Sequence, residues 1–208
     1  MKFKGKDGSR AAVFLDRDGT INEQMGYINH ICRFHLLPGV GDAIKKLNDA
    51  DIPVVVISNQ SGLARGYFPE ELLIAVHEKM NRLLADEGAH VDGIYYCPHH
   101  PEAKEERFRA NCNCRKPKAG LVYQASEEMG LDPETSYVIG DRWSDIKTAA
   151  NCGATSILVR TGYGRGDEQY IGPQQEIQPD FRAENLSEAV DWILSRQNML
   201  TVGVDKKA

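Results

Sequence analysis

The sequence predicts an α/β protein built on a doubly wound, Rossmann-like parallel sheet. Two observations carry this prediction. Short strand-like runs alternate with helical patterns along the chain, which is typical of βαβ units joined by right-handed crossovers. Most of these runs are continuously apolar rather than alternating, as expected for parallel strands that are covered on both faces.

The length suits one domain spanning residues 1–208, and a hydrophobic share of 41% is enough for its core. The longest expected helix, 69–87, begins with Pro-Glu-Glu, a favourable first turn. A frayed tail is expected from about residue 199. The expected strands are 12–15, 53–58, 93–97, 137–140 and 156–160. The other expected helices are 40–47, 121–129, 144–151 and 186–196, and the loop-rich parts are 17–37, 98–118 and 161–184.

Charge and hydropathy exclude several classes of partner. A formal net charge of −5 gives no general attraction to nucleic acid. The longest apolar runs, 11–15 and 54–57, are too short to span a membrane. The lysine-rich start is not followed by a hydrophobic stretch of signal-peptide length. We therefore expect a cytoplasmic protein with neither a nucleic-acid nor a membrane partner, and we take it to be a monomer.

Polar side chains follow three of the expected strands and precede one helix. Because ligands of open α/β sheets bind at the carboxyl ends of the strands, these side chains should gather at one edge. For an isolated pair of aspartates, a simple turn would be the better interpretation. The full set is Asp16 and Asp18, Ser58 and Asn59, Lys116, Asp141 and Asp145.

Four of these stretches, in this order, resemble the motifs of the haloacid dehalogenase superfamily of phosphotransferases. They are FLDRDGT, Ser58, Lys116 and IGDRWSD, and they span residues 14 to 145. The stretches SNQSGLARG, DGIYYCPHHP, CNCRKP and LVRTGYG resemble its sugar-bisphosphate phosphatases and the closely similar histidinol-phosphatases. The resemblance implies a phosphatase acting on a small sugar bisphosphate, with histidinol phosphate as the alternative substrate.

The sequence disfavours two other functions. A nucleic-acid 3′-phosphatase is disfavoured by the acidic charge and the lack of a basic stripe. A catalytically inactive binding module is disfavoured because Asp16, Asp18 and Asp141 are all intact.

The resemblance also implies a role for each motif residue. Asp16 would be the nucleophile that forms an aspartyl-phosphate. Mg²⁺ would be held by the side chains of Asp16 and Asp141 and by the backbone carbonyl of Asp18. Asp18 would protonate the leaving sugar oxygen and then activate water, for which it must hold a proton near neutral pH. Lys116 and Ser58 would stabilise charge on the transferring phosphoryl group.

The chain between the motifs is too short for a separate cap domain, so we expect an open site. Arg115 could pair with a second phosphate or with a nearby acid. Asp145 could order Arg142 or the metal ligands, or only cap a helix. His77 is expected to be a surface or packing histidine. The substrate contacts that the resemblance implies are Gln24, Met25, Gly26, Tyr27, Ser58, Asn59, Gln60, Ser61, Arg115 and Lys116, and Arg142 is a further candidate beside the metal ligand.

A second constellation joins Cys97 and His99 to Cys112 and Cys114. Three thiolates and one imidazole form a suitable tetrahedral set for structural Zn²⁺, and crowded cysteines in a reducing cytoplasm favour metal over disulfides. The similar phosphatases carry zinc at the same pattern. The alternatives are free thiols and a competing imidazole on His100. A closed zinc site would hold the loop 97–114 that leads directly to the catalytic lysine.

Overall fold

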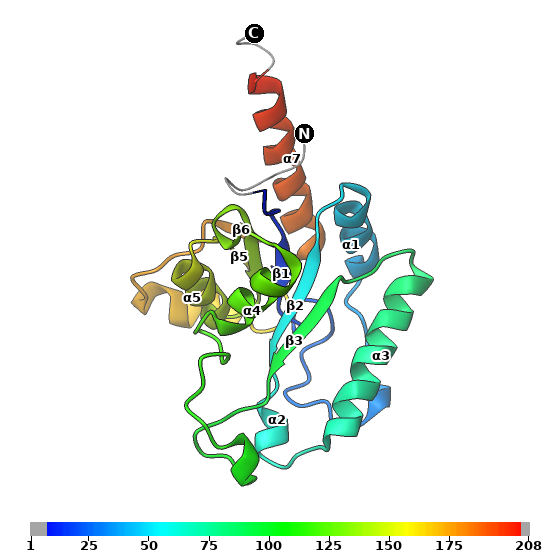
Figure 1. Cartoon of the computed structure of the whole chain (residues 1–208), viewed down its shortest axis with the longest axis vertical. Helices are drawn as coiled ribbons and strands as arrows, with labels where there is room; N and C mark the ends of the chain where they lie inside the picture. The colour runs from blue at the N-terminus through cyan, green and yellow to red at the C-terminus, as the bar shows by residue number, and fades with distance from the viewer. Residues whose placement is uncertain (1–7, 205–208) are drawn as a thin grey trace.

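The computed structural model describes the backbone of residues 8–204 and the side chains of residues 8–196. Six parallel strands form one sheet in the order β3-β2-β1-β4-β5-β6 (Figure 1). The chain runs outward from β1 to β3 and then returns to the other side of β1, so the direction of winding changes between β1 and β4. The strands are β1 (Val13–Leu15), β2 (Val54–Asn59), β3 (Gly93–Cys97), β4 (Tyr137–Gly140), β5 (Thr155–Val159) and β6 (Phe181–Ala183).

Helices cover both faces of this sheet, which confirms the predicted fold class. One core cluster joins Val13 and Leu15 of β1 to α1, α3 and α7, whereas Phe14 belongs to a second cluster with α4 and α5. This division follows from the alternation of side chains along a strand. The helices are α1 (Val40–Asp49), α2 (Ser61–Ala64), α3 (Glu70–Asp86), α4 (Gly120–Met129), α5 (Trp143–Cys152), α6 (Gly164–Gly166) and α7 (Leu186–Val204).

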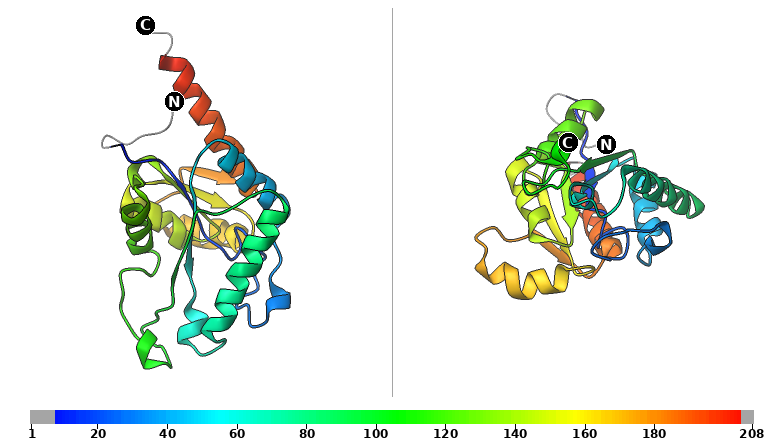
Figure 2. Two further views of the ribbon diagram at one scale, coloured as in Figure 1. Left: turned by 45° about the vertical axis from the view of Figure 1, so that its right-hand side comes forward. Right: turned by 90° about the horizontal axis from the view of Figure 1, so that it is seen from below.

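The segments between the motifs form walls of the site rather than a separate cap domain. Between β1 and α1 the only helical element is the 3₁₀ turn Ile31–Arg33, and the loop 98–118 holds only the turn Glu106–Phe108. That loop and α2 lie at the end of the molecule opposite the projecting helix α7 (Figure 2). The site is therefore built on the carboxyl edge of the sheet itself.

The largest differences from the expectation lie in two segments, in addition to the short helix α2 (Ser61–Ala64), which was not expected. The segment 161–184, expected to be loop-rich, contains α6, the π-helix Asp167–Ile171, the 3₁₀ turn Gly172–Gln174 and β6. Helix α7 continues to Val204, past the point where a tail was expected, and residues 205–208 lie outside the described part of the chain.

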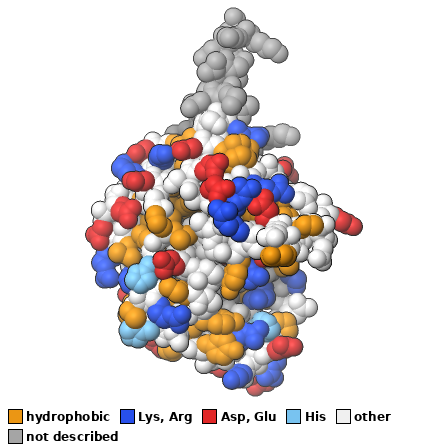
Figure 3. Space-filling view, turned by 180° about the vertical axis from the view of Figure 1, so that it is seen from behind, with side chains coloured by type: hydrophobic (Ala, Val, Ile, Leu, Met, Phe, Trp, Pro, Cys, Tyr) orange, Lys and Arg blue, Asp and Glu red, His pale blue; other side chains and the backbone are white. Residues whose placement is uncertain are grey.

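Charged side chains of both signs are interspersed on the face shown in Figure 3. Some of the charged side chains form ion pairs, and Arg160 pairs with both Glu168 and Glu184. Within the part of the chain that the structure describes, no helix is both long enough and apolar enough to cross a membrane.

Candidate active site

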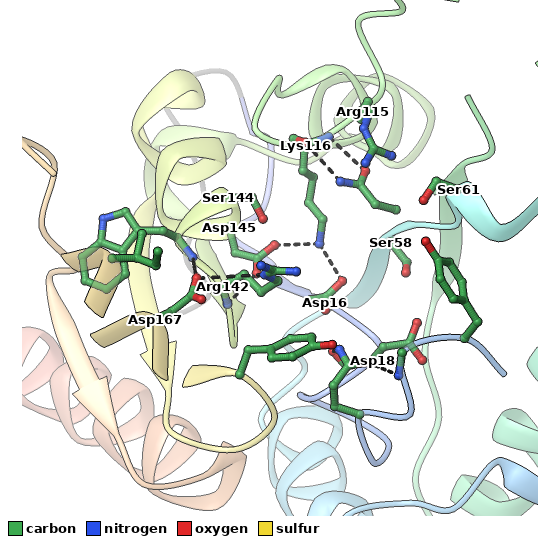
Figure 4. Close-up of a pocket in the computed structure, with 17 residues that line it drawn as sticks. Asp16, Asp18, Ser58, Ser61, Arg115, Lys116, Arg142, Ser144, Asp145 and Asp167 are labelled. Atoms are coloured by element: carbon green, nitrogen blue, oxygen red, sulfur yellow. Dashed lines mark hydrogen bonds and ion pairs between the residues drawn. The ribbon is translucent and has the colours of Figure 1, made fainter. Parts of the chain in front are cut away.

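A cavity of about 500 Å³ lies at the carboxyl edge of the sheet, where the ends of β1, β2 and β4 meet (Figure 4). Residues from the loop 98–118 and from the segment after β5 complete its walls. The expected site residues that line it are Asp16, Asp18, Gln24, Gly26, Tyr27, Ser58, Asn59, Ser61, Arg115, Lys116 and Arg142. The geometry thus brings together side chains that are far apart in the chain.

Lys116 lines this cavity and is almost fully buried. Its Nζ is 2.6 Å from Oδ1 of Asp16 and 2.7 Å from Oδ1 of Asp145, and it donates to the carbonyl of Ile57 at 2.8 Å. Burial works against its charge, but the two carboxylates outweigh burial and raise the pKa of Lys116 above its usual value. The lysine is therefore an ammonium ion held in a fixed position beside the proposed nucleophile.

Three buried acids crowd together beside the lysine. Ligand oxygens of Asp16, Asp141 and Asp145 lie within 4.8 Å of one another. Burial raises the pKa of Asp16 to about 6, and the opposing charge of Lys116 limits that rise. Burial, followed by the charges of Asp16 and Asp145, raises the pKa of Asp141 to about 8. Such crowding of carboxylates is relieved when a divalent cation binds between them.

The surroundings of Asp141 fit a bound cation. Its Oδ2 accepts a hydrogen bond from the backbone N–H of Tyr163 at 2.8 Å. Its buried Oδ1 has no hydrogen-bond partner among the residues that the structure describes. Gly19 and Gly162 adopt positive φ of +92° and +55°, and a Cβ on either would overlap this carboxylate. The two glycines thus accommodate the Asp141 carboxylate, and its unpartnered Oδ1 is a suitable hard ligand for Mg²⁺.

Asp18 is held as an acceptor by three neighbours. Nη2 of Arg17 lies 2.9 Å from Oδ1 and 2.8 Å from Oδ2, while the amides of Asn22 and Gln60 donate at 3.0 and 2.8 Å. Burial alone would raise the pKa of Asp18, but the Arg17 charge and these hydrogen bonds together lower it. The expectation that Asp18 holds a proton near neutral pH is therefore wrong for this state, because Arg17 is buried against it.

Ser58 and Asn59 both line the cavity, but their partners differ. The side chain of Asn59 makes two hydrogen bonds with the backbone of Lys116. It accepts one from the N–H at 3.0 Å and donates one to the carbonyl at 3.1 Å. Gln60 lies outside the cavity lining and donates to the hydroxyl of Ser58 at 2.8 Å. Met25 packs against the core and lines a neighbouring cavity instead.

Two arginines lie on different sides of the cavity (Figure 4). Arg115 donates to the carbonyl of His99 at 3.4 Å and makes no ion pair with an acid within residues 8–196. The guanidinium of Arg142 lies 4.6 Å from the ring centroid of Tyr163 and 4.0 Å from Asp167. Both cations are thus available to an anionic ligand.

Asp145 caps a helix, which is one of the interpretations that the sequence left open, and it also pairs with Lys116, which the sequence did not indicate. Its Oδ2 accepts from the backbone N–H of Arg142 at 3.1 Å, which caps the start of α5, and its Oδ1 pairs with Lys116. Five further residues that the sequence did not indicate also line the cavity. Trp143 and Ser144 begin α5, directly after Arg142, whereas Tyr163, Asp167 and Ile171 lie after β5, where the sequence shows neither a motif acid nor a clear period.

The four expected zinc ligands converge, with donor atoms within 4.8 Å of one another. The Sγ of Cys97 lies 3.5 Å from that of Cys112 and 3.1 Å from that of Cys114, and Nδ1 of His99 is 3.3 Å from the Cys114 Sγ. None of these cysteines is in a disulfide. The donor set and its convergence suit tetrahedral Zn²⁺.

His100 points away from this cluster. Its Nε2 lies 3.0 Å from Nη2 of Arg65, and its Nδ1 accepts from the backbone N–H of Glu102 at 3.1 Å. The remaining two cysteines are also separate, since Cys152 is buried in the core and Cys32 is exposed.

Comparisons with known proteins agree with this site. Residues 113–189 match a family model for HAD-like hydrolases. A D-glycero-beta-D-manno-heptose-1,7-bisphosphate 7-phosphatase of Haemophilus ducreyi is 47% identical over 88% of this chain and 98% of its own length. The Escherichia coli phosphatase of the same name is 41% identical over 94% of both chains.

A crystal structure of a D,D-heptose 1,7-bisphosphate phosphatase from B. bronchiseptica, complexed with magnesium and phosphate, has a similar fold. It shares 34% identity and a TM-score of 0.79, covering 89% of this chain and 99% of that one. The catalytic edge described above and these relatives lead to the same conclusion. The chain belongs to the D-glycero-beta-D-manno-heptose-1,7-bisphosphate 7-phosphatases, a family of phosphoric monoester hydrolases within the haloacid dehalogenase superfamily.

Proposed function

We propose that the protein removes the C7 phosphate of D-glycero-β-D-manno-heptose 1,7-bisphosphate, with Asp16 as the nucleophile of a covalent, Mg²⁺-dependent reaction in heptose biosynthesis. The single observation that carries the mechanism is the pairing of Asp16 with Lys116 at 2.6 Å inside the cavity. The names of the relatives support the substrate. In this proposal the enzyme is a cytoplasmic monomer.

Asp16, Asp141 and the backbone carbonyl of Asp18 would hold the magnesium ion. When bound, the ion neutralises charge between the carboxylate and the phosphate and orients the two for in-line attack. The protein's own contribution is the buried, crowded pair of carboxylates and the open Oδ1 of Asp141. Without a cation this arrangement repels an incoming phosphate.

The transfer of the phosphoryl group then depends on fixed donors. The Asp16 carboxylate attacks phosphorus and the bond to the sugar oxygen breaks, which leaves an aspartyl-phosphate. The Lys116 ammonium and the Ser58 hydroxyl, both at the cavity wall, stabilise the negative charge on the phosphoryl oxygens. Because Lys116 is already bound in place, little reorganisation is needed at the moment of reaction.

Asp18 moves the protons in both half-reactions. In the state described here it is a carboxylate, which suits the second step, when it takes a proton from the water that hydrolyses the intermediate. For the first step it must donate a proton to the leaving sugar oxygen. A phosphate dianion entering beside it raises its pKa, because like charges disfavour ionisation. Substrate binding thus supplies the protonated form that the free enzyme lacks.

Arg115 and Arg142 would recognise the second phosphate of the substrate. Guanidinium groups bind phosphate oxygens in pairs, and both of these face the cavity. Histidinol phosphate, the second candidate, offers a single phosphate and a cationic amine, so two arginines suit it less well. Zinc bound at the Cys97, His99, Cys112 and Cys114 cluster would hold the wall from which Arg115 projects.

Phosphate release from a panel of substrates tests this function. The panel contains both C1 anomers of the heptose bisphosphate, heptose 7-phosphate and histidinol phosphate, and phosphorus NMR identifies which phosphate leaves. We expect the highest kcat/KM for the β-bisphosphate, with heptose 1-phosphate as the product. An equal or higher kcat/KM for histidinol phosphate, or release of the C1 phosphate, would contradict the proposal.

A further inference from the structure

A buried arginine next to the nucleophile has two partners. Arg17 is only 1% exposed, and it ranks among the largest fully buried side chains in residues 8–196. One edge of its guanidinium donates to both carboxylate oxygens of Asp18. Nη2 lies 2.9 Å from Oδ1 and 2.8 Å from Oδ2, and Nε lies 3.3 Å from Oδ1. On the other side, Nη1 lies 3.3 Å from Nε2 of His77. A line of contacts thus runs from helix α3 to the carboxylate that transfers protons.

The His77 ring is in the state that this contact requires. His77 is half-buried on α3, next to the buried Val76, and its ring centroid is 5.7 Å from that of Tyr96. Burial, together with the Arg17 charge, lowers the pKa of His77 to about 4, although Asp18 acts in the opposite direction. The ring is therefore neutral at neutral pH, and its Nε2 can accept a hydrogen bond from Arg17 while Nδ1 carries the proton.

The geometry explains why Arg17 needs this second partner. A guanidinium is planar and carries five N–H donors, so two contacts on different edges define its plane. The contact with Asp18 joins neighbouring residues on one loop and does not by itself connect the guanidinium to another element of the fold. The contact with His77 joins that loop to a long helix 60 positions away in the chain.

We propose that His77 is a positioning residue for catalysis: by accepting a hydrogen bond from Arg17, it fixes the guanidinium that holds Asp18 in place for proton transfer. This inference rests on the proposed function, in which Asp18 is the general acid and base. Misplacement of a reacting group by about 1 Å costs about a hundredfold in rate. Because Asn22 and Gln60 still hold Asp18 when His77 is lost, we expect a smaller effect of about tenfold.

The test compares two substrates that differ in how much they need an acid. A sugar phosphate has a poor alkoxide leaving group and requires protonation, whereas p-nitrophenyl phosphate has a good leaving group and requires little. The ratio kcat/KM reports events up to phosphoryl transfer, so hydrolysis of the intermediate does not obscure it. A purely structural defect would lower kcat/KM for both substrates by the same factor.

Three variants carry the comparison. His77→Phe keeps a ring against Tyr96 but removes the acceptor, and it should lower kcat/KM for the sugar phosphate about tenfold while changing the aryl ester little. His77→Gln offers an acceptor oxygen and should restore most of the loss. Tyr96→Phe, the matched control, removes only a hydroxyl that contacts Glu70 and should behave as the wild type. Should His77→Phe fail to fold, His77→Leu takes its place.

Asp18→Asn, measured in parallel, separates the inference from the proposed function. If Asp18→Asn lowers kcat/KM for both substrates equally, the acid role of Asp18 is wrong and the inference falls with it. If Asp18→Asn shows the selective loss but His77→Phe affects both substrates equally or neither, only the role of His77 is overturned. A His77→Gln enzyme as impaired as His77→Phe would also overturn it.

Discussion

The ammonium of Lys116 lies 2.6 Å from the carboxylate of Asp16, although the two residues are 100 positions apart in the chain. Asp16 directly follows the central strand β1, whereas Lys116 lies two residues after Cys114, at the end of the loop that carries the Cys/His cluster. The distance between the proposed nucleophile and the lysine is therefore set by the sheet on one side and by this loop on the other.

Replacement of this lysine should be far more costly for catalysis than for folding. We expect Lys116→Met to lower kcat by about a hundredfold to a thousandfold, because the variant loses a fixed cation beside the transferring phosphoryl group. Steady-state kinetics and circular dichroism measure the two effects. Lys45→Met, which removes an exposed lysine paired with Asp49 on α1, serves as the control. Near-normal kcat in a folded Lys116→Met enzyme would remove the lysine from the mechanism.

Replacement of a proposed zinc ligand should lower activity, because the same loop positions Lys116 in the active site. We expect Cys112→Ser to lose zinc and lower kcat, with loss of order confined to the loop because the sheet has its own core. Elemental analysis and kinetics measure both effects, and Cys32→Ser, an exposed cysteine outside the cluster, is the matched control. Zinc-free protein from a purification without chelators would reject the site. Zinc loss with unchanged kinetics would leave the metal a stabilising role only.

Magnesium should be required for turnover. The acids Asp16 and Asp141 offer only hard oxygen ligands, so brief treatment with EDTA should stop phosphate release and added Mg²⁺ should restore it. Asp141→Asn should need far more Mg²⁺ for half-maximal activity. Full activity of the wild type in rigorously Mg²⁺-free buffer is the result that would refute this assignment.

The stability of the metal-free protein should fall as the pH rises. Burial, Asp16 and Asp145 raise the pKa of Asp141 from 3.8 to about 8, so between these values the folded chain keeps a proton that the unfolded chain has released. That contribution to the free energy of unfolding is complete below about pH 4 and is lost as the pH approaches 8. Thermal melts in EDTA measure it, and Asp141→Asn should flatten the slope. Because the lowered pKa of His77 acts in the opposite direction below about pH 6.5, the comparison with Asp141→Asn is decisive, and equal slopes of Tm against pH in the two proteins would contradict the crowding of the acids.

The parts of the fold that sequence reasoning recovered are those with a strong periodic signal. The continuous apolar runs before Asp16 and Asp141 proved to be the buried strands β1 and β4. Strand β6 was missed because Phe181–Ala183 has three residues with an arginine in the middle. The helical turns after β5 were missed because glycines and charged residues interrupt any apolar period there.

Some features of the candidate site could be predicted from the sequence, whereas others could not. Acids at the ends of parallel strands can be predicted to meet, because the topology alone brings those ends together. The ionisation of Asp18 could not be predicted, since it depends on how Arg17 is buried. The contact between Arg17 and His77 could not be predicted from the sequence either, because it requires α3 to pack against the loop that follows β1.

The central claim is that Asp16 attacks phosphorus, and phosphate release by Asp16→Asn tests it most directly. Turnover of the heptose bisphosphate is measured beside circular dichroism, on protein shown by mass spectrometry to be free of deamidation. The amide cannot act as the nucleophile, so we expect a folded protein without turnover. Appreciable phosphate release by this verified variant would contradict the covalent mechanism.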